Sequence, residues 1–200
     1  MPLPLTTLCT VHSLLAAVLL VSSCTHDPEN IQALNPRYRT LTTKLLAREP
    51  DSHLESAVLE HVLWRIAGDV DREYERVAAL PWSFQVVYAT WWLEAEVNNG
   101  GFKQYFSNSK GRFANEALKG FEILGARQHA GLVRQAIWIH QARMPILDSA
   151  RLKGTTAAFS HTYSDDPFAP IDRQFLELKT DLSSLRVAFI RKYYQDFVHR

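Results

Sequence analysis

One segment of the chain concentrates the side chains that could bind or react. Residues 94–108 read Glu-Ala-Glu-Val-Asn-Asn-Gly-Gly-Phe-Lys-Gln-Tyr-Phe-Ser-Asn, which sets carboxylates and amides beside aromatic residues. Carboxylates and amides without a nucleophile, a set of metal ligands or a positioned base are typical of recognition rather than catalysis. The segment therefore predicts a polar binding pocket and no catalytic residue. We expect five side chains to converge on it: Glu96, Asn98, Asn99, Gln104 and Asn108.

The same residues also have a purely structural interpretation. Gly100 can adopt the left-handed conformation that closes a helix, and Gly101 allows an immediate change of direction. Asn98 and Asn99 tolerate that conformation, and their amides can bond the last free carbonyls of the helix. Phe102 and the aromatic residues after it would then return to the core. Both interpretations stay open from the sequence alone.

Other catalytic or metal-binding patterns are weak. His53 and His61 are eight residues apart beside Glu60, but the chain has no His-Glu-x-x-His motif. Glu94 and Glu96 are two positions apart on an expected helix, so they point to different faces. Both cysteines lie in the first 24 residues, so the remaining chain has no thiolate metal site. We expect no metal and no cofactor; a hydrolase with an unrecognised site near Glu96 remains an alternative.

The charge balance argues against direct nucleic-acid binding. The chain has 22 Lys and Arg against 21 Asp and Glu, a net charge of +1, whereas nucleic-acid binding needs a concentrated cationic surface. The charges are nevertheless segregated along the chain. Residues 49–75 hold eight acidic and two basic residues, and residues 103–153 hold nine basic and three acidic ones. Such segments are usually solvated faces or face one another; the alternative is a polar surface that docks a protein partner.

The first 24 residues have the pattern of a targeting signal. Residues 1–23 contain no Lys, Arg, Asp or Glu, and the apolar run 14–21 is too short to span a membrane but suits a secretory signal. The sequence Val-Ser-Ser-Cys ending at Cys24 resembles a bacterial lipobox, and Thr25 after it resembles outer-membrane sorting. We therefore expect a signal peptide over 1–23 and a cell-envelope lipoprotein, held in the outer membrane by lipid on Cys24 and facing the periplasm. The lack of a positive charge before residue 10 departs from usual signals, and a cytoplasmic location is the alternative.

The remaining chain predicts an all-α fold. Residues 24–50 contain three prolines and read as a tether, with one short helix possible around 38–47. Hydrophobic residues then recur at helical spacing over 54–66, 82–98, 112–124 and 127–142, with Pro145 beyond the last of these. Residues 149–170 read as a long surface loop. Residues 171–193 form one helix, or two helices divided near Asp181. We predict a single multi-helix bundle domain over residues 51–200.

Residues 91–108 resemble the signature of the DUF4375 family, the all-helical family of the DNA-mimic protein DMP19. The flanking segments extend the resemblance over roughly residues 54–198. The resemblance implies an α-helical fold, homodimerisation and binding to a transcriptional regulator. A DNA mimic presents carboxylates where phosphates would lie, and this chain has no acidic excess. We therefore expect a lipid-anchored, non-catalytic protein-interaction module of unknown target. The alternative is a cytoplasmic module that binds a regulator through residues 49–75.

Overall fold

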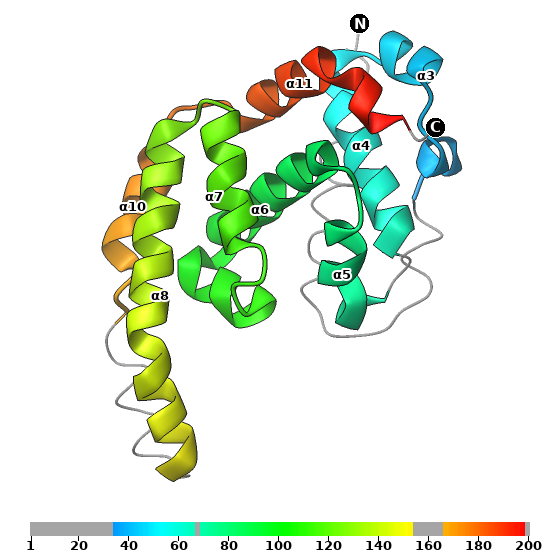
Figure 1. The fold of residues 1–200 in the computed structure, drawn as a ribbon. Coiled ribbons are helices and arrows are strands. Elements are labelled where there is room, and N and C mark those ends of the chain that lie inside the picture. Colours follow the sequence, from blue (N-terminus) through cyan, green and yellow to red (C-terminus); the bar gives the residue numbers. More distant parts are fainter. Residues whose placement is uncertain (1–33, 67–68, 154–165, 199–200) are drawn as a thin grey trace, which may run out of the picture. The chain divides into compact units, whose positions relative to one another are not determined.

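The computed structural model describes residues 34–66, 69–153 and 166–198, and the regular elements in these ranges are all helices (Figure 1). The all-α prediction is confirmed for this part of the chain. The backbone divides into two compact units. Unit 1 contains the chain up to Tyr88 together with the residues from Arg186 onward, and unit 2 runs from Ala89 to Leu185.

Unit 1 is built from short helices around one longer one. In chain order its elements are η1 (Pro36–Arg39), α3 (Thr43–Arg48), α4 (Asp51–Ile66), η2 (Val70–Arg72), α5 (Glu73–Ala78), the start of α6 (Trp82–Ser109), most of α11 (Leu182–Lys192) and η3 (Tyr194–Phe197). The predicted stripe of α4, from Leu54 to Ile66 at every fourth position, is buried. Phe84 of α6 packs its ring against His61 of α4 and Phe197 of η3.

Much of the segment predicted as a tether belongs to the folded body of unit 1. Tyr38 and Leu46 are buried, and the Tyr38 hydroxyl donates a hydrogen bond to Oε1 of Glu49 at 2.9 Å. Asn35 caps η1 and Thr42 caps α3 through their side-chain oxygens. The prediction of a tether reaching residue 50 was therefore wrong from residue 35 onward. Two of the prolines that suggested a tether instead begin or separate short helices, since Pro36 lies in the first turn of η1 and Pro50 lies between α3 and α4.

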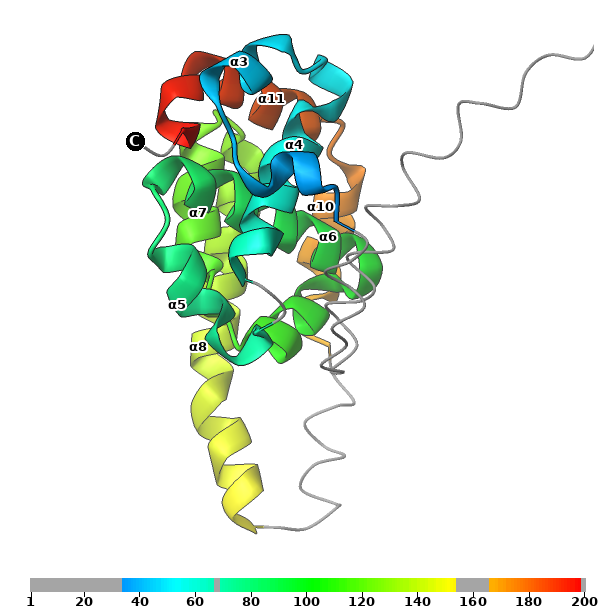
Figure 2. The ribbon, with the colours of Figure 1, turned by 90° about the vertical axis from the view of Figure 1, so that its right-hand side faces the viewer.

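Unit 2 contains the rest of α6 with α7 (Ala114–Ile123), α8 (Arg127–Lys153) and α10 (Ala169–Glu177). Both α7 and α10 pack along α8, as Figures 1 and 2 show. The core between these helices is aromatic. The ring centroids of Phe102 of α6 and Phe175 of α10 are 5.6 Å apart. Phe106 stacks on His140 of α8, with ring centroids 4.1 Å apart.

Two helix boundaries differ from the sequence prediction. The helix α8 continues through Pro145 to Lys153, so Pro145 lies inside this helix and part of the predicted 149–170 loop is helical. Residues after the glycine pair return to helix and complete α6 at Ser109. Of the two alternatives expected for residues 171–193, the structure has two helices divided near Asp181, because α10 ends at Glu177 and α11 begins at Leu182.

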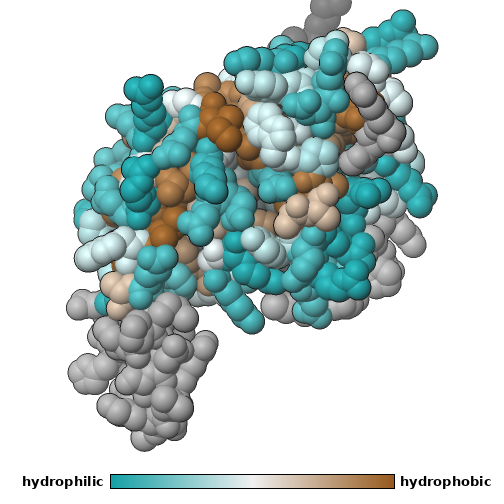
Figure 3. Space-filling model, viewed as in Figure 1, coloured by the Kyte–Doolittle hydropathy of each residue, from teal (hydrophilic) through white to brown (hydrophobic). Residues whose placement is uncertain are grey.

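The predicted signal peptide, Cys24 and the first part of the tether lie outside the described residues. Within the described ranges, no helix is both long and apolar enough to cross a membrane. The face of the molecule in Figure 3 is covered mainly by hydrophilic side chains, with hydrophobic residues showing between them.

Candidate functional site

The Asn-Asn-Gly-Gly segment, residues 98–101, forms a sharp turn inside α6, called the glycine turn below. Its helical geometry fails at Gly100, with φ −157° and ψ 26°, and at Gly101, with φ 75° and ψ 179°. Only Gly101 has a positive φ, and its φ/ψ pair is accessible to glycine and almost no other residue. The expected left-handed position was therefore misplaced by one residue. The predicted break itself is confirmed.

A residue far along the chain holds the glycine turn. The backbone N–H of Phe102, the first residue after the turn, donates to Oδ1 of Asp172 in α10 at 2.8 Å. This bond satisfies one of the free N–H groups that every helix start presents, as a capping side chain does locally. A Cβ added at Gly101 would lie 2.4 Å from Oδ2 of Asp172, so the carboxylate needs a glycine there. Burial and the nearby Asp166 charge raise the pKa of Asp172.

Three of the five predicted site residues meet at one carboxylate. Oε2 of Glu96 accepts hydrogen bonds from Nε2 of Gln104 at 3.0 Å and from Nδ2 of Asn108 at 2.8 Å. Glu96 precedes the glycine turn and both amides follow it, so the cluster ties the two halves of α6 together. The Gln104 side chain also lies against the turn, because a Cβ on Gly100 would come within 2.2 Å of its Oε1. We call Glu96, Gln104 and Asn108 the Glu96 cluster.

The carboxylate of this cluster is poorly solvated. Glu96 is only 1% exposed, and its burial raises the pKa of the carboxyl above its usual value, while the two amide hydrogen bonds oppose that rise. Its second oxygen, Oε1, is buried and has no hydrogen-bond partner among the described residues. A buried acceptor without a partner costs free energy that a hydrogen bond would recover. The Glu96 cluster therefore has capacity for one further hydrogen-bond donor.

Asn98 and Asn99 do not join the cluster. Both side chains are exposed at the end of the first half of α6. The prediction that all five polar residues converge was therefore wrong for these two. Their place in the sequence beside the glycines explains the error, since a helix end turns its last residues toward solvent.

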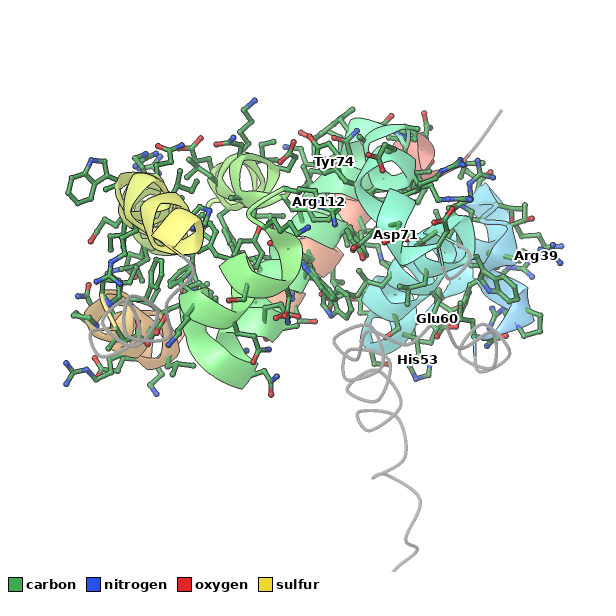
Figure 4. The ribbon with its side chains drawn as sticks, turned by 90° about the horizontal axis from the view of Figure 1, so that it is seen from below. Arg39, His53, Glu60, Asp71, Tyr74 and Arg112 are labelled. Atoms are coloured by element: carbon green, nitrogen blue, oxygen red, sulfur yellow. The ribbon has the colours of Figure 1, made fainter. Side chains whose placement is uncertain are left out.

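The histidines considered as ligands lie in different surroundings. His53 is exposed on α4, 3.8 Å from Glu49, and is labelled in Figure 4. His61, two turns later, is buried with its Nδ1 3.0 Å from the carbonyl oxygen of Tyr38. In the described ranges, no three His, Cys, Asp or Glu side chains gather as a metal site would require.

The acidic segment 49–75 is largely used inside unit 1. Glu49 pairs with Arg37 at 2.8 Å, and Asp51 pairs with Arg191 at 2.6 Å. Arg186 donates to Glu55, and Arg76 donates to Asp69. The backbone N–H of Asn35 donates to Glu60, and the Tyr88 hydroxyl donates to Glu73. Two acidic residues of the segment, Asp71 and Glu75, are exposed, and Figure 4 labels Asp71. Most of the negative charge in this segment is therefore matched by groups of the same unit.

The family model of the DMP19-like protein matches residues 78–193, which is more than half of the chain. The chain belongs to the DMP19-like family. The matched region contains the glycine turn, the Glu96 cluster and Asp172, so the geometry described above lies within the DMP19-like domain. No curated protein and no solved structure matches the chain.

Proposed function

We propose that this DMP19-like domain is a non-catalytic protein-interaction module, lipid-anchored through Cys24 in the bacterial cell envelope. Family membership supports an interaction module. The anchor rests on the lipobox-like sequence that ends at Cys24 and on the run of uncharged residues before it. A lipidated Cys24 would lie about ten residues before the first described residue, Leu34, and would hold the domain close to the membrane.

One observation carries the recognition part of the proposal: the unmatched Oε1 of the buried Glu96 carboxylate. The Asp172 cap already accounts for the glycine turn, so a second buried carboxylate is not needed to build it. Oε2 of Glu96 ties the two halves of α6 together, but the buried Oε1 costs stability without a partner, and such departures are expected at functional sites. Oε1 itself is buried, so a partner would bind at the exposed Asn108 and at the glycine turn beside the cluster.

The alternative, binding of a regulator through residues 49–75, has less support. Six of the eight acidic side chains of this segment are engaged within unit 1. A partner that used them would have to replace these bonds, and breaking a buried ion pair such as Glu55–Arg186 is costly. DNA mimicry has the same difficulty, because it needs exposed carboxylates.

A site-specific crosslink tests the recognition site. A photo-crosslinking amino acid at Asn99, which is exposed at the glycine turn, should give one adduct in cells that mass spectrometry identifies as a single protein. The change Glu96→Ala should weaken this adduct strongly, while the crosslinker at Ala79, exposed in unit 1, should not form it. An adduct that is insensitive to Glu96→Ala would refute recognition by the cluster.

Lipid labelling tests the anchor separately. Labelled palmitate should be incorporated into the wild-type chain and not into Cys24→Ala, and globomycin should cause the unprocessed form to accumulate. Absence of label from the wild type, or equal label on Cys24→Ala, would refute the anchor without affecting the recognition site.

A further inference from the structure

The exposed face of α8 presents a tryptophan to solvent. Trp138 is 70% exposed, the largest exposed fraction of any large hydrophobic residue in the described ranges. The same helix has a buried face inside unit 2, which includes Ala130, Val133 and Ala136. A large aromatic side chain left in water gives up the burial free energy that it could contribute. Trp138 therefore has no packing role that explains it within unit 2.

Helical periodicity places two arginines on the same face. Arg127, Gly131 and Arg134 precede Trp138 by eleven, seven and four positions, which puts all four residues in one stripe along α8. Both arginines are exposed, and Arg134 also bonds to Glu122 of α7 at 2.5 Å. Among the described residues, no atom beyond the helix's own backbone lies within 4 Å of a Cβ added at Gly131, so the stripe is open between the arginines. We call these four residues the Trp138 stripe.

The part of the chain that contains the stripe has more basic than acidic residues. Residues 103–143 contain seven Lys and Arg against Glu116 and Glu122. Glu122 already pairs with Arg134, and Glu116 is half-buried. Lys119 of α7 is exposed as well. The exposed Lys119, Arg127 and Arg134 therefore outnumber Glu122, the carboxylate that pairs with the stripe.

We propose that the Trp138 stripe is a docking surface for an acidic segment of a partner protein, with a hydrophobic residue of that segment covering the indole. Tryptophan and arginine are the residues most enriched in interface hot spots, and the cationic surroundings are complementary to carboxylates. The Trp138 stripe shares no residue with the Glu96 cluster. This proposal rests on the proposed function only in that both require a protein partner.

The composition of the stripe distinguishes this partner from a membrane. A helix that lies on a lipid surface buries a broad apolar face, whereas Trp138 stands between exposed polar residues, Gln135 and Gln141. One indole with two arginines fits a protein hot spot better, because a single pocket on a partner can cover it. An acidic peptide is therefore the occupant to test first.

Binding of defined probes to the purified full chain tests the proposal. The main probe is a fluorescein-labelled peptide of alternating Asp and Glu around one central Leu, followed by fluorescence anisotropy. Two comparison probes are tested in the same way: a matched peptide with Lys in place of Asp and Glu, and vesicles of phosphatidylglycerol and phosphatidylethanolamine. We expect the acidic peptide alone to bind, and Trp138→Ala and Arg134→Glu to weaken it about tenfold each.

Two control variants keep the result interpretable. Arg173→Glu makes the same charge change at an exposed position of α10, and Trp82→Ala removes a partly exposed tryptophan of unit 1; neither should change peptide binding. Trp138→Ala should keep the wild-type circular dichroism spectrum, because the indole is exposed. Equal binding by Trp138→Ala, binding of the basic peptide or of vesicles alone, or burial of Trp138 in a dimer of this chain would each overturn the proposal. An intact Asn99 crosslink in any of these cases would leave the proposed function standing.

Discussion

The change Gly101→Ala tests most directly how the glycine turn is held. An alanine at this position must adopt φ 75° and ψ 179°, a region that residues with a Cβ avoid. The new Cβ would also lie 2.4 Å from Oδ2 of Asp172. Because the carboxylate must move away, its hydrogen bond to the Phe102 N–H is lost as well.

The expected cost can be assembled from these parts. Backbone strain in a glycine-only region costs about 1–3 kcal/mol. Loss of the Asp172 cap adds about 1 kcal/mol. The smaller freedom of alanine in the unfolded chain returns about 0.5–1 kcal/mol. We therefore expect Gly101→Ala to lower the free energy of unfolding of unit 2 by about 2–3 kcal/mol.

Two other glycines provide matched controls. Gly125 has φ 78° but no atom within 4 Å of an added Cβ, so Gly125→Ala should cost only the left-handed strain, about 1 kcal/mol. Gly131 lies within the helix α8 in open space, so Gly131→Ala should stabilise by about 0.8 kcal/mol. The three substitutions are chemically identical and differ only in backbone conformation and neighbours.

Urea unfolding followed by circular dichroism would measure these differences, and hydrogen exchange at the Phe102 amide would report the cap itself. In the Asp172→Ala background, Gly101→Ala should cost about 1 kcal/mol less, because both the clash and the cap are already gone. The reasoning fails if Gly101→Ala costs no more than Gly125→Ala, or if the two changes at residues 101 and 172 add without coupling.

Three further changes follow from buried charge and shared hydrogen bonds. Burial raises the pKa of Glu96 above its usual 4.5, so the free energy of unfolding should fall as pH rises from 4.5 through that raised value, by about 1.4 kcal/mol for each pKa unit. Glu96→Gln should abolish this fall and raise the midpoint of thermal unfolding at pH 7. Burial lowers the pKa of His140 below 6.5, so stability should instead fall as pH drops below 6.5, and thermal scans of His140→Phe should lack this loss. Arg191 donates to Asp51 and to the carbonyl of Leu46, so urea unfolding should show a loss of about 2 kcal/mol for Arg191→Ala and a smaller loss for Arg191→Lys.

Local sequence signals predicted the helices because those signals act over a few residues. The four-residue spacing of α4 and the division between α10 and α11 were both visible in the periodicity. The end of α8 was not, because Pro145 usually ends a helix and here it does not. The tether was also predicted wrongly, because its prolines and polar residues resemble those of a linker. Burial of Tyr38 and Leu46 depends on partners elsewhere in unit 1 that composition cannot reveal.

The candidate site shows the same division between local and distant information. Gln104 follows Glu96 by eight residues, and Asn108 follows Gln104 by four. This spacing across the glycine turn allowed the sequence to predict that the three side chains meet. Asp172 contacts the turn from 70 residues later in the chain, and no local pattern around it indicates that role. A glycine pair that follows a helix predicts a turn, but it does not identify the side chain that caps it.

Segregated charge in the sequence is a poor guide to exposed charge, and this chain shows why. The acidic segment of residues 49–75 looked like a surface for a partner, yet arginines from residues 37, 76, 186 and 191 and two other donors engage six of its carboxylates. Two of these arginines come from α11, more than a hundred residues away, so the pairing cannot be read from the segment itself. In the basic segment, by contrast, Arg127 and Arg134 are exposed in the same stripe of α8 as Trp138. The docking surface proposed above therefore offers exposed charge in unit 2, whereas most carboxylates of the acidic segment in unit 1 are already engaged.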